Sequence, residues 1–358
     1  MLPRPLAILG ALTIIAGTGA AVRILPAGGA SPPPPRPAAQ QAPAMSQAMA
    51  AESTTTFVGF VDTAASPGFD PPAAFRRTGV RHYLLGHLVA GGPDGCDPKW
   101  AAPPDQDTTP DSAEQATDDA DALEPDTSPA DPLEAGVGRG LDPGKNPVAN
   151  KIGPLRAMGG DAAPAFGGPE GRDPAATCTD PDRLTAAYRR VVGAFDAAAI
   201  DFEVRDSDDG AVLRRARAIR AIQRERPLRV SFTLPLRPHG LDSGDVAMLR
   251  ATHEAGAEVT TVNLLATMEP DPRGRLRRLA DAVRLARDQI AHAYALPDPG
   301  QAWPRIGLTP VLKDKDHLDE PEARTLADYA TRYGLAWLSL RGVPPSRGTS
   351  RILWDIAP

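Results

Sequence analysis

From residue 55 onward, short apolar runs alternate with longer amphipathic stretches along the chain. The runs are five to eight residues long, and several are rich in β-branched side chains, which is typical of buried parallel strands. They lie at 57–61, 82–89, 162–166, 199–204, 228–234, 259–265, 306–312 and 335–340. Between several of them, apolar side chains recur at helical spacing. These stretches predict helices at 181–195, 208–226, 243–255, 275–295 and 322–333.

Eight strands in alternation with helices favour a closed α/β barrel, the (β/α)8 TIM barrel, built as a single domain. An open, doubly wound sheet is the alternative, but no GxGxxG motif follows the first run. We therefore predict one barrel domain over residues 53–345, followed by a C-terminal tail at 346–358.

Residues 101–149 break this rhythm. They are rich in Asp, Pro, Ala and Gly, and 101–134 contain eleven Asp or Glu and no Lys or Arg. Such a composition cannot offset its ordering entropy by burial, so it predicts a disordered acidic insertion in the loop after the second strand. That loop opens on the face of the barrel where active sites lie. The insertion is either an acidic flap or a low-complexity expansion, and the small cost of lengthening a surface loop favours the second.

The first 25 residues have the pattern of an export signal. Arg4 precedes an uncharged apolar stretch at 6–22, which ends in small residues. Because that stretch is just long enough to cross a bilayer, an uncleaved N-terminal anchor is the alternative. A Pro- and Ala-rich linker is predicted at 26–52. Both interpretations predict a secreted or extracytoplasmic protein, in the second case with a membrane tether.

Charge and cysteine content narrow the classes of function. Of the net charge of −6, eleven negative charges lie in 101–134, which leaves +5 on the rest of the chain. No basic run interleaved with aromatic residues indicates a nucleic-acid partner. The six His residues lack metal-ligand spacing, so neither a metal nor another cofactor is predicted. In an oxidising compartment Cys96 and Cys178 are a candidate disulfide, and two buried free thiols are the alternative.

The most informative segment is 199–205, where charged residues interrupt an apolar strand. Asp201, Glu203 and Arg205 share one strand face because the pleat has period two. In a barrel that face points inward, and the last residues reach the open mouth. Buried charges are costly unless they are paired or functional. The cluster is therefore either a catalytic site or a group of charges that neutralise one another.

Short motifs along the chain resemble those of bacterial chitinases of glycoside hydrolase family 18. They occur in order from about residue 56 to 341 and cover nearly every predicted strand. They are FVGFVD at 57–62, CDPKW at 96–100, FGG at 166–168, CTDP at 178–181, AIDF at 199–202, LRVSFTLP at 228–235, VNL at 262–264, GLTP at 307–310 and WLS at 337–339. The resemblance implies a (β/α)8 barrel that acts on chitin-like, β-1,4-linked N-acetylglucosamine.

The family signature on the fourth strand is DxxDxDxE. Its final Glu protonates the glycosidic oxygen, and the preceding Asp orients the acetamido group that acts as the internal nucleophile. The four positions here are Ala198, Asp201, Glu203 and Arg205, so the resemblance assigns the remaining catalytic roles to Asp201 and Glu203. Arg205 stands at the general-acid position, and a guanidinium with a pKa above about 12 does not donate a proton near neutral pH.

Other family positions have changed as well. The SxGG pattern becomes AFGG at 165–168, and the Asp of a Met-x-Met-Asp-Tyr stretch falls on Met268, beside Glu269. Arg341 replaces the Trp that floors the sugar site. The resemblance makes Met268, Glu269 and Arg341 candidate substrate-binding residues, and Trp100 is a candidate sugar platform.

The resemblance also supports a bridge between Cys96 and Cys178. It places both cysteines in loops that emerge side by side on one barrel face. The bridge would close a loop of about 80 residues, with an entropic stabilisation on the order of 4 kcal/mol.

Three functions fit these observations. The first is an exported chitinase-like protein that is catalytically impaired and binds a chitin-like polysaccharide or a partner. The second is an active chitinase or β-N-acetylglucosaminidase-type hydrolase whose acid has moved, for example to Glu269 or Asp206. The third is a surface scaffold without a sugar ligand, its pocket closed by salt bridges. The joint loss of several sugar-handling positions favours the first. Pairing with Arg205 or Arg341 is expected to lower the pKa of Glu203.

Overall fold

A computed structural model describes residues 55–102, 145–169, 171–205 and 208–356 of the chain. The predicted signal or anchor at 1–25, the linker at 26–52 and most of the insertion at 101–149 lie outside these residues. Among the described residues, no helix is both long and apolar enough to cross a bilayer.

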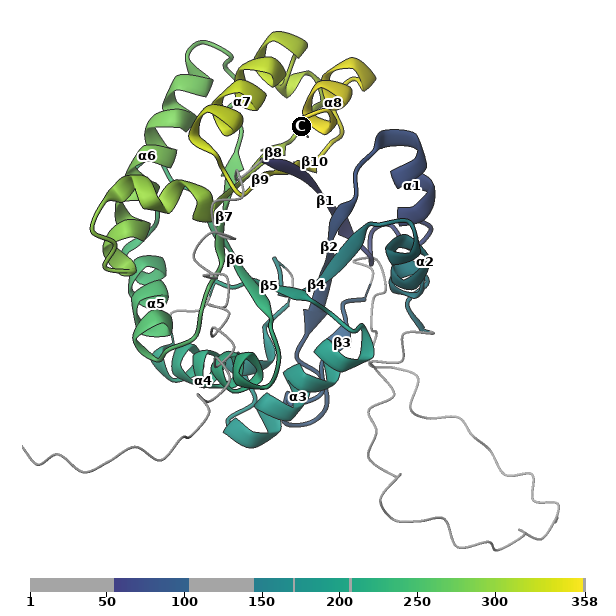
Figure 1. Cartoon of the computed structure of the whole chain (residues 1–358), viewed down its shortest axis with the longest axis vertical. Helices are drawn as coiled ribbons and strands as arrows, with labels where there is room; N and C mark the ends of the chain where they lie inside the picture. Colours follow the sequence, from purple (N-terminus) through teal and green to yellow (C-terminus); the bar gives the residue numbers. More distant parts are fainter. Residues whose placement is uncertain (1–54, 103–144, 170, 206–207, 357–358) are drawn as a thin grey trace, which may run out of the picture. The chain divides into compact units, whose positions relative to one another are not determined.

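Eight parallel strand positions form a closed barrel. The sheet order is β1-β9-β8-β7-β6-β5-β4-β2, and β1 also pairs with β2, which closes the ring (Figure 1). The strands are β1 (Thr56–Asp62), β2 (His82–Val89), β4 (Asp161–Gly167), β5 (Ala199–Glu203), β6 (Arg229–Pro235), β7 (Thr261–Thr267), β8 (Ile306–Leu312) and β9 (Trp337–Leu338). Two short strands flank the ring: β3 (Lys99–Trp100) is antiparallel to β2, and β10 (Arg341–Gly342) is parallel to β8. The predicted (β/α)8 barrel is confirmed.

Helices surround the strands (Figure 1). They are α1 (Pro71–Thr78), α2 (Ile152–Ala157), α3 (Pro181–Ala194), α4 (Asp209–Glu225), α5 (Ser243–Glu254), α6 (Arg275–Ala293), α7 (Glu320–Tyr333) and α8 (Arg347–Trp354). Short 3-10 turns lie at Ala149–Lys151, Pro174–Ala176, Pro299–Arg305 and Lys315–His317. All five predicted helices are present, with ends within two residues of those expected. Asp180, Asp208 and Asp319 cap α3, α4 and α7 with their side chains, so each start was marked in the sequence.

The helices that the sequence did not predict are the short ones, α1, α2 and α8, which have six to eight residues. Segments of this length show little helical periodicity. Helix α8 lies within the segment expected as a tail, and its Leu353 is buried.

The last residues of the predicted insertion are ordered. Val148 is fully buried, and Asn146 accepts hydrogen bonds from the backbone N–H groups of Val148 and Ala149. The Asn146 amide also donates to Thr63 at 3.0 Å. These contacts attach residues 146–149 to the end of β1, so the predicted disorder does not apply to them.

Strand alternation separates an aromatic outer layer from a polar interior. Phe202 of β5 stacks on Phe166 of β4, with ring centroids 5.1 Å apart, and contacts Tyr188 of α3. The neighbouring Asp201 and Glu203 point the other way, since their partners come from across the barrel. The inward direction predicted for these two carboxylates is confirmed.

Candidate active site at the barrel mouth

Two glycines place Glu203 at the mouth. Gly167 ends β4 and Gly168 follows it, with positive φ angles of 86° and 91°, which favour glycine. The N–H of Gly168 donates to the backbone oxygen of Glu203 at 2.9 Å. A Cβ atom on Gly167 would lie 2.2 Å from that oxygen, and one on Gly168 would lie 2.5 Å from Cγ of His87. Any larger residue would separate the ends of β2, β4 and β5.

The Glu203 carboxylate is held by two groups from other strands. Its Oε2 accepts hydrogen bonds from His87 Nε2 of β2 at 2.9 Å and from Arg341 Nη1 of β10 at 2.5 Å. The side chain is 3% exposed. Burial alone would raise the pKa of Glu203, but the His87 hydrogen bond and the charge of Arg341 together lower it to about 2. Glu203 is therefore ionised at neutral pH, and His87 carries a hydrogen on Nε2 because an ionised carboxylate can only accept.

Arg341 also packs against an aromatic ring. Its guanidinium carbon lies 3.5 Å from the ring centroid of Phe60 in β1, a cation–π contact, and its side chain is 9% exposed. The ring of His87 lies 5.4 Å from the same Phe60 ring. The predicted pairing of Glu203 with an arginine is thus made by Arg341.

Asp201 lies one layer deeper and has neutral partners. It is fully buried and accepts hydrogen bonds from Ser231 Oγ at 2.5 Å and from Thr233 Oγ1 at 3.0 Å, both on β6. Burial raises the pKa of Asp201 to about 6, against the opposing effect of the Ser231 hydrogen bond. Asp201 can therefore hold a proton under mildly acidic conditions.

A ladder of hydrogen bonds continues from Asp201 across the barrel. Asn263 Nδ2 of β7 donates to Thr233 Oγ1 at 3.1 Å. In turn Asn263 Oδ1 accepts from Thr309 Oγ1 at 2.7 Å and from Trp337 Nε1 at 3.2 Å. Five neighbouring strands, β5 to β9, are thereby joined inside the barrel.

Arg205 does not join either layer. Strand β5 ends at Glu203, so Arg205 lies two residues beyond it and is exposed to solvent. No hydrogen bond or ion pair of Arg205 is present in the described part of the chain. The period-two alternation of side chains ends with the strand at Glu203 and does not extend to Arg205.

Similarity to known proteins points to chitinases. A segment of 124 residues, 32% of this chain, is 27% identical to a probable bifunctional chitinase/lysozyme of Escherichia coli (strain K12). The segment covers 14% of that protein's length. A scan against protein-family models found no match.

Solved structures agree on the fold. The catalytic domain of a hyperthermophilic chitinase from Pyrococcus furiosus matches 85% of this chain and 95% of its own chain, with a TM-score of 0.62 and 21% identity. Active domain 2 of the thermostable chitinase from the same organism, in catalytic-site mutants complexed with chito-oligosaccharides, matches with a TM-score of 0.62 and 22% identity, over 85% of this chain and 94% of its own. This chain is a chitinase-like barrel.

The other predicted substrate-binding residues of the chitinase-like barrel make no hydrogen bond, ion pair or ring contact with Glu203 in the described part of the chain. Met268 is 3% exposed. Glu269 is exposed and accepts a hydrogen bond from Arg278 Nε at 2.8 Å. The ring of Trp100 packs edge-on against Phe195, which follows α3, at 5.8 Å. Of the candidate residues, Arg341 is the one that the structure places with Asp201 and Glu203.

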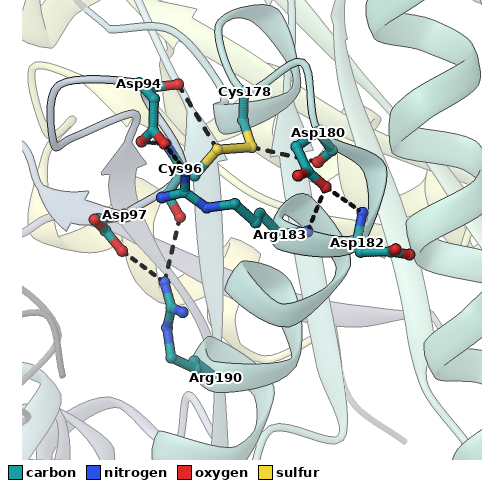
Figure 2. A network of polar contacts seen from close by, with 8 residues as sticks. All are labelled: Asp94, Cys96, Asp97, Cys178, Asp180, Asp182, Arg183 and Arg190. Carbon is teal, nitrogen blue, oxygen red and sulfur yellow. Dashed lines mark hydrogen bonds and ion pairs between the residues drawn. A yellow bond between two sulfur atoms is a disulfide. The ribbon is translucent and has the colours of Figure 1, made fainter. Parts of the chain in front are cut away.

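The predicted disulfide is present. Cys96 and Cys178, which are 82 positions apart in the sequence, are bonded with their Cα atoms 4.8 Å apart, and they join the loops after β2 and β4 (Figure 2). Arg183 pairs with Asp94, and Arg190 donates to the Cys96 backbone oxygen at 3.2 Å. Helix α3 therefore fixes the loop after β2 from outside the barrel, and the disulfide joins the loop after β4 to it.

A buried ion pair holds the same loop after β4. Asp173 accepts hydrogen bonds from Tyr188 Oη of α3 at 2.6 Å and from Arg215 Nε of α4 at 2.8 Å. All three side chains are at most 2% exposed. The loop after β4, which begins at Gly168, is thus bonded to both α3 and α4.

Sequence reasoning missed His87, Phe60 and the hydroxyl and amide side chains of the ladder. A signal for the ladder was present, since Ser231, Thr233 and Asn263 are polar positions inside otherwise apolar strands. His87 likewise interrupts an apolar run. Their partners, however, depend on how the barrel closes, which no local pattern specifies.

Proposed function

We propose that this chain is an exported chitinase-like protein of glycoside hydrolase family 18 that has lost hydrolysis and binds a chitin-like polysaccharide at its barrel mouth. The ordered family motifs, the sequence similarity to a probable chitinase/lysozyme and the fold shared with the Pyrococcus furiosus chitinase support this assignment.

The state of Glu203 carries the proposal. Glycoside cleavage requires a group that gives a proton to the leaving oxygen. Arg205 stands where the family has that group, and Glu203 is kept ionised by His87 and Arg341. Asp201 takes up a proton near pH 6, but it is fully buried below Glu203 and bonded to β6. The mouth is therefore built to accept hydrogen bonds rather than to deliver a proton.

The same site retains groups that suit a sugar. Within the described residues, Oε1 of Glu203 and Nε and Nη2 of Arg341 are buried without a hydrogen-bond partner. An unmade hydrogen bond at a buried polar atom costs about 1–3 kcal/mol. Hydroxyl and amide groups of a saccharide offer both the donors and the acceptors that these atoms lack.

Hydrolysis is tested with a fluorogenic chitobioside on the wild type, Arg205→Ala and Glu203→Gln. We expect all three to give the same background rate. A wild-type rate well above that of both variants would contradict the proposed loss of activity. Retention on insoluble chitin at moderate salt tests binding, with Glu203→Gln expected to weaken it.

The position of Arg341 favours a second candidate, a scaffold that binds no sugar. Its guanidinium covers Glu203 Oε2 and lies on Phe60, which occupies part of the mouth. If neither the wild type nor Arg341→Ala is retained on chitin, the scaffold is preferred.

Export is proposed from residues 1–25. Cell fractionation with N-terminal sequencing tests it and distinguishes a cleaved signal from an anchor.

A further inference from the structure

A groove of about 530 Å³ lies between α4 and α5, which are neighbours in the outer layer of helices (Figure 1). One side is a stripe along α4 made by Leu213, Arg217, Arg220 and Arg224. The spacing of four, three and four residues keeps these side chains on one helix face. The other side comes from Ala251, Glu254 and Ala255, at the end of α5. The small alanines leave the space into which the arginines project.

The three arginines outnumber the acidic residues of the groove lining, which include Glu254. All are exposed, and in the described part of the chain none of them forms an ion pair. Like charges three and four residues apart repel one another. By contrast, Arg214 on the same helix pairs with Asp208, and Arg215 pairs with Asp173. Arg220 donates to the Ala255 backbone oxygen at 3.0 Å, which keeps its guanidinium at the groove.

The groove is remote from the mouth. Helix α4 begins after the C-terminal end of β5 and returns toward the start of β6, so its second half, with Arg217 to Arg224, lies toward the opposite end of the barrel. A ligand here would bind independently of Glu203.

The lining residues distinguish among anionic ligands. Arg217 and Arg224 are about 10 Å apart along the helix axis, so the stripe suits a chain of spaced anionic groups better than a single ion. Glu254, on the α5 side of the groove, would accept hydrogen bonds from the hydroxyl groups of a sugar chain. Leu213 and the alanines can contact the apolar faces of sugar rings. The lining includes no aromatic ring on which nucleic-acid bases would stack.

We propose that the groove between α4 and α5 binds a carboxylate-bearing polysaccharide. The planar guanidinium forks of the arginines match carboxylates, and the remaining lining groups match the hydroxyls and rings of a sugar chain. The barrel would then have a second carbohydrate-binding surface, whether or not the mouth binds chitin.

The test measures binding of the full chain to polygalacturonate at moderate salt. The variant Arg217→Gln/Arg220→Gln/Arg224→Gln removes the stripe. The matched control, Arg277→Gln/Arg332→Gln/Arg347→Gln, removes three exposed positive charges from α6, α7 and α8. Thermal unfolding verifies that both variants fold. We expect the dissociation constant to rise on the order of tenfold for the stripe variant and less than about twofold for the control.

The proposal would be overturned if the wild type did not bind polygalacturonate, or if the two triple variants lost the same amount of affinity. It would also be overturned if polyglutamate or single-stranded DNA bound with equal affinity and with the same dependence on the stripe. Loss of polygalacturonate binding in Glu203→Gln would place the ligand at the mouth instead. Chitin retention is measured separately, so a negative result for either proposal does not affect the test of the other.

Discussion

Asp201 and Glu203 lie two residues apart on the same face of β5, yet their acid–base properties diverge. Both side chains are almost completely buried. The pKa of Asp201 is raised to about 6 and that of Glu203 is lowered to about 2. The inner layer supplies Asp201 with neutral hydroxyl donors, whereas the mouth layer supplies Glu203 with the guanidinium of Arg341 and the imidazole of His87.

The comparison shows that burial does not by itself decide the state of a carboxyl group. Hydroxyl donors reduce the cost of ionising Asp201 but do not cancel the loss of water. For Glu203, the hydrogen bond from His87 and the positive charge of Arg341 together outweigh that loss. A barrel that needs a proton donor at its mouth would require the opposite arrangement, with the uncharged surroundings outermost.

The largest expected change in unfolding free energy comes from removing the positive charge of Arg341 beside Glu203. Arg341→Met leaves an ionised carboxylate buried with His87 alone, and breaking a buried pair in this way costs about 3–5 kcal/mol of unfolding free energy. Urea unfolding measures the loss. Arg341→Met/Glu203→Gln should recover much of it, because the buried charge is gone.

The control for this prediction is the exposed pair of Arg189 and Glu225. Arg189→Met should cost several-fold less, since water solvates the remaining carboxylate. Equal losses of unfolding free energy in Arg341→Met and Arg189→Met would mean that Arg341 stabilises Glu203 no more than an exposed ion pair does.

The next effect concerns the loops that shape the mouth layer. Cys96→Ser/Cys178→Ser releases the loops after β2 and β4 and should lower the unfolding free energy by about 2–4 kcal/mol. Hydrogen exchange should show greater opening near His87 and Gly168, whereas the Ser231–Asn263 side, held by β6 and β7, should stay protected. Uniform loss of protection would show that the disulfide stabilises the barrel as a whole rather than its mouth.

A somewhat smaller effect should distinguish Asp201 by pH. Its raised pKa means that the folded state binds a proton more readily than the unfolded state between about pH 4 and pH 6. Its stabilising contribution is therefore complete below pH 4 and is lost as the pH rises through 6. Relative to Asp201→Asn, the wild type should lose up to about 3 kcal/mol between pH 4 and pH 7. A difference that stays constant with pH, measured by urea unfolding, would contradict the raised pKa.

The inward direction of Asp201 and Glu203 could be predicted from the alternation of residues in 199–204. Period two correctly placed Asp201 and Glu203 inside the barrel and Phe202 outside it. The composition of the strands also predicted the barrel, and the changed family positions drew attention to Arg341 as a partner of Glu203. These inferences succeeded because each depends on a strand's own pattern or on pairing between opposite charges.

The surroundings of Trp100 and His87 could not be predicted from the pattern of a single strand. The short β3 pairs antiparallel with β2, and the ring of Trp100 packs against Phe195. His87 meets Glu203 from 116 positions away, a distance that no local pattern spans. Packing across the closed barrel decides both contacts.

The smallest effect should come from Arg205, the residue that drew most attention in the sequence. It lies beyond the last residue of β5 and is solvated, so Arg205→Ala should change the unfolding free energy by less than about 0.5 kcal/mol. The pH dependence attributed to Asp201 should also be unchanged, because the two side chains belong to different surroundings. A loss comparable to that of Arg341→Met would show that Arg205 forms a third charged layer after all. A negligible change would confine the electrostatic contrast to the two layers around Asp201 and Glu203.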